Sequence, residues 1–364
     1  MTGDRQVTPR RMKAAVYYGA RDVRIEDRPI PECTAGQVLL RVLRSGVCGT
    51  DATEWRSGPH LFAVDRPHPV SGHVGPLILG HEFIGEVVES PGGGFAVGDR
   101  VAAGAGVWCG ECPRCVEGRT NLCWSYTTLG LNVDGGMAEF VAAPEKMLAP
   151  VPEGLSLDVA GLAQPLAVGL HAARRSGVSD GDRVVIIGAG AIGSFVLAGV
   201  RSLAAAEITV IDFPGPRLDR ALRIGATRVV PAGMNVVADT LAGIGARGAD
   251  VVIEASGAPG QLATAIRMVR SGGTILLVGL PASPPEVDVQ SLVIREITIR
   301  TSNAHVFAHD LAPALQLLAT TNLGRELVDS VHPLDDIAEQ LERLATGQLH
   351  GKVLFDPQRS TDPP

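Results

Sequence analysis

The spacing of apolar and polar residues changes along the chain. Up to about residue 150, short apolar or alternating runs are separated by glycine and proline, as in 12–18, 37–44 and 83–101. Short runs of this kind between turn-forming residues predict β-strands. We therefore expect an antiparallel, strand-rich first domain whose loops contain cysteine and histidine. The stretch Pro150–Gly154 marks the change to a different pattern.

Beyond this stretch, short apolar strands alternate with helical segments. The expected strands are 184–187, 208–211, 228–230, 251–254, 274–278 and 297–300. Helices are expected over 191–204 and 216–224, followed by two amphipathic helices within 308–347 and a last strand over 351–355. Because strand–helix alternation places helices on both faces of a parallel sheet, the pattern predicts an α/β protein with a doubly wound parallel-sheet domain.

Length and composition narrow the possibilities. A chain of 364 residues is too long for one ordinary core, so we expect two domains. The formal net charge of −7 offers no basic surface for nucleic acid. The N-terminus lacks an apolar signal core, and the longest uncharged run, 184–200, contains four glycines that fit a strand, turn and helix. With six cysteines, mostly clustered, we expect a cytoplasmic protein that binds neither nucleic acid nor membrane.

Four cysteines lie within fifteen residues, spaced C-x2-C-x2-C-x7-C. They are Cys109, Cys112, Cys115 and Cys123. Four thiolates at this spacing can surround one Zn²⁺ tetrahedrally without leaving an open position, which predicts a structural rather than a catalytic zinc. Chance clustering and two disulfides are the alternatives. The small number of cysteines and the missing signal peptide disfavour both.

A glycine pattern marks a candidate dinucleotide site. Gly188, Gly190 and Gly193 form G-x-G-x-x-G directly after an expected strand and at the start of an expected helix. The first glycine permits the tight turn, the second lets the backbone approach a pyrophosphate, and the third allows close packing of helix and strand. The free N–H groups of the helix start, at Ala191 and Ile192, favour phosphate. The alternative is a glycine-rich turn that binds no ligand.

An acidic residue follows at the end of the next expected strand. Asp212 lies 19 residues after Gly193, where a carboxylate can accept hydrogen bonds from both adenosine ribose hydroxyls and repel a 2′-phosphate. This favours NAD over NADP. Arg217 complicates the preference because an arginine at this distance can serve either cofactor. Asp212 could instead be a simple turn residue.

A second group of candidate metal ligands lies upstream. Cys48 follows one expected strand and His81 follows an apolar run, and Gln164 lies where the pattern changes to strand–helix alternation. A catalytic zinc needs about three protein ligands and one open position. Cys48 and His81 are a natural pair for it, although a single cysteine or histidine is more often a structural residue.

These motifs together resemble the zinc-dependent medium-chain alcohol dehydrogenases, most closely the polyol and 2,3-butanediol dehydrogenase branch. The resemblance extends from Met12 to about Phe355, and the long segment between Asp51 and Gly80 is similar to an insertion of butanediol dehydrogenases. It rests on Gly46-Val-Cys48-Gly-Thr50-Asp51, Leu79-Gly-His81-Glu82, the four-cysteine stretch, Gly135-Gly136-Met-Ala-Glu139-Phe, Pro165-Leu-Ala-Val-Gly-Leu-His171 and the glycine pattern.

The resemblance implies an architecture and cofactors. It implies a GroES-like catalytic domain over 1–163 and 305–364 and a Rossmann NAD-binding domain over 164–304. It also implies NAD and two zinc ions per chain, one catalytic and one structural. A homodimer or homotetramer is expected, because the strand 297–300 is an edge that relatives often pair across a two-fold axis.

The resemblance also implies roles for individual residues. Cys48 and His81 would hold the catalytic zinc, with Glu82 as a third ligand or as a neighbour that exchanges with water. Asp51 would orient the His81 ring, as metal-bound histidines require, or cap the following helix. Thr50 would take the proton of the substrate hydroxyl.

In the expected NAD-binding domain, Val278 and Gly279 would border the nicotinamide. Lys352 would reach the pyrophosphate.

Two positions depart from the family pattern. Polyol-type relatives usually have glutamate where this chain has Gln164, which can coordinate through its carbonyl oxygen but adds no negative charge. With Cys48 as the one charged ligand the zinc site would have a formal charge of +1, which should lower the pKa of a bound alcohol further. Thr53 replaces a histidine that relays the proton to solvent, and threonine cannot store a proton near neutral pH.

The expected reaction is NAD- and zinc-dependent oxidation of a secondary alcohol to a ketone by hydride transfer, on a small-molecule diol, polyol or cyclic alcohol. An alternative substrate is a bulky cyclitol, sugar or terpene alcohol of specialised metabolism, which the departures at Gln164 and Thr53 keep open. A zinc-free reductase of the same family is disfavoured by the cysteine stretch. A non-catalytic nucleotide-binding protein is disfavoured by the intact Cys48, Thr50, His81 and Glu82.

Overall fold

A computed structural model describes residues 10–359, and these form two compact units. The first unit holds the described residues up to Gln164 together with those from Asp329 onward, and the second unit runs from Pro165 to Val328. The second unit thus includes the segment 305–328, which the sequence analysis assigned to the catalytic domain.

The first unit is rich in strands. Its strands are β1 (Arg11–Gly19), β2 (Asp22–Pro29), β3 (Gln37–Gly46), β4 (Leu77–Ile78), β5 (Glu82–Glu89), β6 (Arg100–Ala103), β7 (Gly106–Val107), β8 (Thr127–Thr128), β9 (Phe140–Pro144), β10 (Leu148–Pro150), β17 (Val328–Pro333) and β18 (Lys352–Asp356). Its helices are α1 (Gly49–Ser57), α2 (Pro113–Val116), α3 (Leu157–Ala160) and α12 (Ile337–Ala345), with 3-10 turns at Thr120–Leu122, Glu145–Met147 and Leu334–Asp336.

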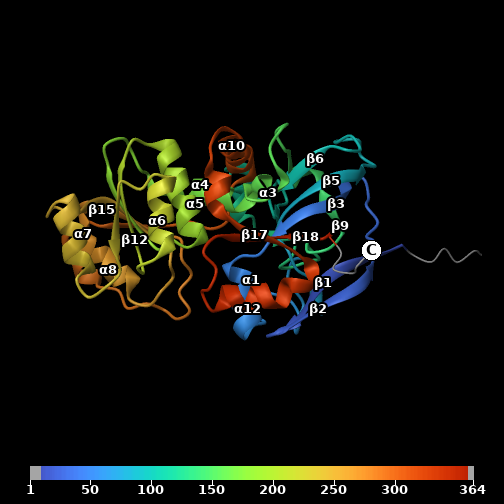
Figure 1. Ribbon diagram of the computed structural model, residues 1–364, viewed down its shortest axis with the longest axis horizontal. Helices are drawn as coiled ribbons and strands as arrows, with labels where there is room; N and C mark the ends of the chain where they lie inside the picture. The colour runs from blue at the N-terminus through green and yellow to red at the C-terminus, as the bar shows by residue number, and fades with distance from the viewer. Residues whose placement is uncertain (1–9, 360–364) are drawn as a thin grey trace, which may run out of the picture. The chain divides into compact units, whose positions relative to one another are not determined.

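Antiparallel pairing organises the first unit, as the spacing predicted. β1 pairs with β2 and with β4 in a three-stranded sheet, and a larger sheet has the order β10-β6-β5-β3-β18-β17, with β9 also on β3. β18, from the end of the chain, pairs with β3 through Leu354↔Gly46. This pairing places the C-terminal strand beside the residues just before Cys48 (Figure 1).

The second unit is a doubly wound parallel sheet. Its strands are β11 (Arg183–Ile187), β12 (Glu207–Asp212), β13 (Arg228–Pro231), β14 (Ala249–Glu254), β15 (Val269–Leu277) and β16 (Thr298–Thr301). Its helices are α4 (Ala163–Ser176), which begins at the unit boundary, α5 (Ala191–Leu203), α6 (Pro216–Ile224), α7 (Val236–Ile244), α8 (Gln261–Met268), α9 (Val289–Ile294), α10 (Phe307–Thr320) and α11 (Leu323–Leu327). The strand order is β13-β12-β11-β14-β15-β16, so the order reverses at β11.

The central strands of this sheet are buried on both faces. Val184 and Ile186 of β11 pack in one apolar cluster with side chains of α4, α5 and α6, while Val185 and Ile187 pack in another with α7 and α8. In Figure 1, α5 and α6 accordingly lie on one side of β12, and α7 and α8 on the other. The continuous apolar strands seen in the sequence are explained by this two-sided burial.

The C-terminal part of the chain differs from the sequence prediction. Residues 308–347 were expected to form two amphipathic helices, but β17 separates α10 and α11 from α12. β17 is a neighbour of β18 at the edge of the large sheet of the first unit. Its β-branched Val328 and Val331 suit an extended strand, so pairing with β18 decides the structure here.

No helix within residues 10–359 is long and apolar enough to cross a membrane.

Candidate metal centres and dinucleotide site

Cys48 is the N-cap of α1. Its Sγ accepts the Thr50 N–H at 3.3 Å, and the Asp51 carboxylate accepts the Cys48 N–H at 2.8 Å. The two bonds form a reciprocal capping box. Asp51 therefore has the capping role that the sequence left open, and the start of α1 fixes the thiol and Thr50 next to each other.

His81 lies next to the Cys48 thiol. It lies just before β5, where Glu82 pairs with Gly46 of β3. The Cys48 Sγ lies 3.0 Å from His81 Nε2, and His81 Nδ1 lies 3.7 Å from Asp51 Oδ1. The three side chains bring possible ligand atoms within 4.8 Å of one another. A ring with Nε2 at a thiol and Nδ1 at a carboxylate has the orientation of a metal-bound histidine.

The electrostatic surroundings of Cys48, Asp51 and His81 favour the binding of a cation. Burial alone would lower the pKa of His81, but Cys48 and Asp51 raise it to about 10, while burial raises the pKa of Asp51. His81 Nδ1 and Asp51 Oδ1 are buried and have no hydrogen-bond partner among residues 10–359. A thiolate and an imidazole side by side, with a carboxylate behind the ring, match the N and S ligands that Zn²⁺ prefers.

Glu82 has a partner that the sequence did not suggest. It forms an ion pair with Lys352, the first residue of β18, and the two side chains are only 2% and 3% exposed. The packing around the pair is close, because a Cβ added to Gly46 would lie 2.5 Å from Glu82 Oε2. A separation of 270 residues gives no sequence signal, and the pairing depends on the strand order β5-β3-β18.

The two positions that depart from the family pattern lie in different surroundings. Gln164 is buried near the start of α4, and no hydrogen bond or ion pair in the described part of the chain joins it to Cys48, His81 or Glu82. Thr53 is exposed on α1, and its hydroxyl donates to the Gly49 carbonyl at 2.9 Å.

The segment between Asp51 and Gly80 is anchored by a buried acid that the sequence analysis missed. The Glu54 carboxylate accepts the backbone N–H groups of His60 and Leu61 at 2.9 and 2.6 Å. Glu54 is 1% exposed, so the start of the segment is tied to α1 by buried hydrogen bonds. A glutamate within a short polar helix gave no signal of this role.

The four-cysteine stretch gathers into one cluster. Sγ atoms lie 3.5 Å apart for Cys109 and Cys123 and 3.9 Å apart for Cys112 and Cys123, far longer than the ~2.05 Å of a disulfide. All four ligand atoms lie within 4.8 Å of one another. The stretch therefore has free thiols in a metal-binding arrangement, and the disulfide alternative is excluded.

Backbone amides and burial change the pKa values of these thiols. The Trp124 amide is the main cause that lowers the pKa of Cys112 to about 6, and the amides of Glu111 and Cys112 lower that of Cys109. Burial and the neighbouring thiols raise the pKa of Cys115 to about 12. A divalent cation would allow all four to ionise together, so the donor set fits a closed zinc site.

The glycine loop has the geometry expected of a dinucleotide site. Gly188 has a φ of +99°, which suits the tight turn, and a Cβ at Gly193 would lie 1.8 Å from the Gly188 carbonyl oxygen. A Cβ at Gly190 would meet nothing within 4 Å, so space is open where a phosphate would approach. Gly190 is the N-cap residue of α5 but, as a glycine, has no side chain that could accept an N–H of the first turn, which contains Ala191 and Ile192.

Asp212 ends β12 beside this loop. Its carboxylate accepts the Ala189 N–H at 2.6 Å and the Phe213 N–H at 2.7 Å. Arg217 lies in the first turn of α6, on the next connection. Asp212 thus holds the glycine loop in place as well as standing at the end of the strand.

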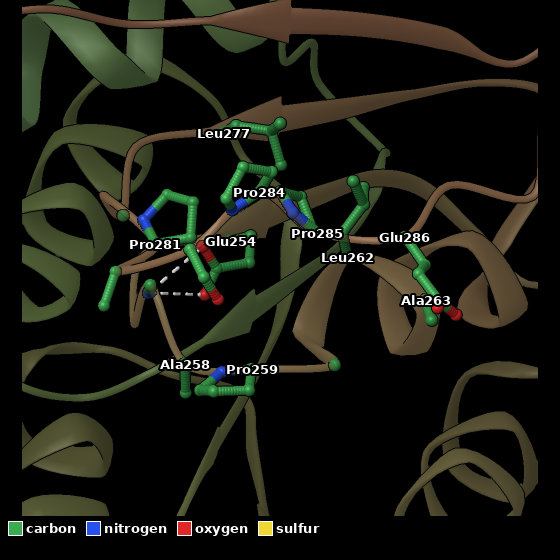
Figure 2. Close-up of a pocket in the computed structure, with 15 residues that line it drawn as sticks. Glu254, Ala258, Pro259, Leu262, Ala263, Leu277, Pro281, Pro284, Pro285 and Glu286 are labelled. Carbon is green, nitrogen blue, oxygen red and sulfur yellow. Dashed lines mark hydrogen bonds between the residues drawn. The ribbon is translucent and has the colours of Figure 1, made fainter.

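The carboxyl ends of β14 and β15 lie along the same edge of the parallel sheet as the carboxyl end of β12. Val278 and Gly279 both donate their N–H groups to the Glu254 carbonyl, at 2.8 and 3.0 Å. The Glu254 carboxylate in turn accepts the Gly257 N–H, as Figure 2 shows. Glu254, Gly257 and Gly279 border a cavity of about 330 Å³ that is also lined by the proline-rich loop 281–286. In parallel sheets, ligands bind at this edge near the point where the strand order reverses.

Known proteins share both units. Residues 34–153 match the family described as alcohol dehydrogenase GroES-like domain, and residues 191–320 match the family described as zinc-binding dehydrogenase. Sorbitol dehydrogenase of Bacillus subtilis (strain 168) is 33% identical over 341 residues, which cover 92% of this chain and 94% of that protein.

Solved structures agree with the family matches. The crystal structure of 2R,3R-butanediol dehydrogenase from Bacillus subtilis has a TM-score of 0.87 at 30% identity, covering 95% of this chain and 100% of that one. A zinc-binding dehydrogenase from Sinorhizobium meliloti 1021, bound to NADP, has a TM-score of 0.85 at 29% identity, covering 96% and 100%.

Proposed function

The chain belongs to the zinc-dependent medium-chain alcohol dehydrogenase family, and from this premise we propose that it oxidises a secondary alcohol of the diol or polyol class to a ketone. NAD is the proposed hydride acceptor, and the proposed zinc site is built on Cys48 and His81. The observation that carries the proposal is the 3.0 Å approach of Cys48 Sγ to His81 Nε2, with Asp51 behind the ring.

The proposed zinc ligands are Cys48, His81 and the neutral carbonyl oxygen of Gln164. Zinc bound there would polarise the alcohol oxygen and lower its pKa. Asp51 faces the His81 ring and is proposed to orient it, and Lys352 forms a buried ion pair with the Glu82 carboxylate. Glu82 is therefore proposed as a neighbour of the zinc rather than a permanent ligand.

Thr50 is the proposed first acceptor of the substrate proton. Its N–H bonds the Cys48 thiol, which fixes the residue beside the proposed zinc ligand. A threonine hydroxyl can accept one proton while donating its own, so Thr50 would pass the proton to the cofactor ribose and then to water, as the family resemblance implies, and would not store it. Thr53, exposed on the same helix, has the same limitation, and we expect activity to rise toward alkaline pH.

The glycine loop and Asp212 are proposed to bind the NAD pyrophosphate and ribose. The uncapped start of α5 offers N–H groups to the phosphates. Each Asp212 oxygen that accepts a backbone N–H keeps a second lone pair for a ribose hydroxyl, and its charge repels a 2′-phosphate. Val278 and Gly279 at the β15 end are the proposed neighbours of the nicotinamide. A second, structural zinc in the four-cysteine cluster completes the proposed cofactors.

A homodimer or homotetramer is proposed from the edge of the parallel sheet. All four residues of β16 are exposed, and Val293 and Ile294 of the preceding helix are exposed as well. An edge strand of this kind pairs readily with a second copy across a two-fold axis.

The test is NADH formation across secondary alcohols, vicinal diols, sugar alcohols, cyclitols and terpene alcohols, with NADP as a control and zinc content read on the same sample. Turnover of a vicinal diol or sugar alcohol with NAD and two zincs per chain supports the proposal. Turnover confined to a bulky cyclic alcohol would correct the substrate class. Zinc and NAD bound without any turnover would contradict the enzyme function.

A further inference from the structure

A buried arginine lies behind the glycine loop. Arg220 of α6 is 5% exposed, although arginine is rarely buried in proteins. Its Nη2 donates to the Ala189 carbonyl at 2.9 Å and to Ser194 Oγ at 3.2 Å. Ala189 is the residue between the first two glycines of the pattern, and Ser194 lies in the first turns of α5. Arg220 thus binds the loop and the helix that would cradle the phosphates.

Ala189 is held from both sides. Its N–H donates to Asp212 at 2.6 Å, and its carbonyl accepts from Arg220 and, at 3.3 Å, from Ser194. A trans peptide bond points its carbonyl and its N–H in opposite directions. Because Arg220 draws the Ala189 carbonyl inward, the Gly190 N–H on the same peptide points away from Arg220. Space is open at the Gly190 Cα.

The charge of Arg220 acts in the same direction. A guanidinium near the start of α5 adds its positive charge to the positive end of the helix dipole, and both attract an anion. A pyrophosphate at the loop would therefore be favoured by this charge as well as by the N–H groups of the loop.

We propose that Arg220 is a positioning residue of the dinucleotide site, one that orients the Gly190 N–H through the Ala189 carbonyl and places a buried positive charge behind the pyrophosphate. The inference rests on the proposed cofactor function and deepens it. Arg220 binds Ala189 and Ser194 behind the loop, so we expect it to affect the binding of ligands that contain phosphate and not the binding of adenosine.

The test compares R220M, which removes donor and charge, with R220K, which keeps the charge but loses the forked geometry. R223Q is the matched control, because Arg223 is on the same helix and makes an exposed ion pair with Glu326. Dissociation constants for NADH, ADP and adenosine are measured by calorimetry on the zinc-loaded full chain, together with the KM for NAD, kcat and thermal stability.

We expect R220M to weaken NADH and ADP binding about tenfold or more, because the variant loses a buried hydrogen bond from a charged group. We expect adenosine binding and kcat at saturating NAD to stay within about twofold, R220K to fall between R220M and wild type, and R223Q to match wild type. Equal weakening of adenosine and ADP, or no change in either variant, would overturn the inference.

The two proposals fail in different ways. Wild-type protein that binds neither NADH nor ADP would refute the cofactor function itself. Wild-type protein that binds both, with R220M and R220K equally tight, would refute only the role of Arg220. If R220M does not fold, R220K still decides the question, because a lysine that restores full affinity shows that the forked contact with Ala189 is not needed.

Discussion

At the scale of single residues, the candidate zinc site depends on side chains that act on one another. Cys48 and Asp51 cap the same helix, and Asp51 also faces the His81 ring, so one carboxylate serves the fold and the site. Glu82 is next in sequence to His81 but points to Lys352.

Removing Lys352 leaves a buried, unpaired carboxylate. We expect K352M to lower the free energy of unfolding by about 3–5 kcal/mol, because removing one partner of a buried ion pair strands the other. The double variant K352M/E82Q should recover much of the loss. Urea unfolding of wild type, K352M, E82Q and the double variant measures the coupling between the two side chains. Simple additivity of the two single changes would show that the pair is not an interacting unit.

A histidine at position 53 would add a group that stores a proton near neutral pH. We expect T53H to shift the alkaline rise of kcat toward neutral pH by about one unit, since an unperturbed histidine titrates near pH ~6.5. The measurement is a pH–rate profile with NAD, with T53S as the control that keeps only a hydroxyl. Identical profiles for T53H and wild type would argue against a proton path past this exposed position.

At the scale of elements, a buried acid ties α10 to α4 within the second unit. Asp310 is fully buried, accepts the Val306 N–H, and pairs with His171 at 3.0 Å and with Arg174. Burial alone would raise the pKa of Asp310, but His171, the Val306 amide and Arg174 lower it overall. The segment that follows β16 is therefore fixed at the start of α10.

Replacing Asp310 should loosen this connection. A carboxyl whose folded pKa is depressed contributes stability above its unfolded pKa of about 3.9 and loses it as pH falls through the folded value. We expect D310N to cost about 1–3 kcal/mol at neutral pH, since it removes the negative charge that pairs with Arg174 and weakens the buried hydrogen bonds that Asp310 accepts. The difference from wild type in urea unfolding should be constant above about pH 5 and shrink in acid. A pH-independent difference would mean that the ion pair is not its source.

At the scale of the whole molecule, the exposed edge of the parallel sheet is where self-association is expected. A lysine on an edge strand opposes strand pairing, so I299K should shift the protein toward monomer. L203K is the matched control, because Leu203 is a similarly exposed apolar residue on α5. Light scattering after size-exclusion chromatography gives the mass. An unchanged mass for I299K would place the interface elsewhere.

Much of the fold followed from local patterns. Apolar strands alternating with helices predicted the parallel sheet, and α6 begins and ends at the residues expected. β17 was missed because its extended conformation depends on pairing with β18, which the spacing within 308–347 does not record. The four cysteines were recognised because a short stretch contains the whole cluster.

The sequence by itself determined the features that lie within a few residues of one another: the cysteine cluster, the glycine loop with its helix, and Cys48 at the start of α1. The spacing of a few residues determines each of these features, because residues that are close in the chain must also lie close in space. Only the tertiary structure decided that Glu82 pairs with Lys352, that Asp310 pairs with His171, and that Arg220 lies behind Ala189. Which partner a buried charge meets depends on the order of the strands and the packing of the helices. Both of these depend on the whole unit.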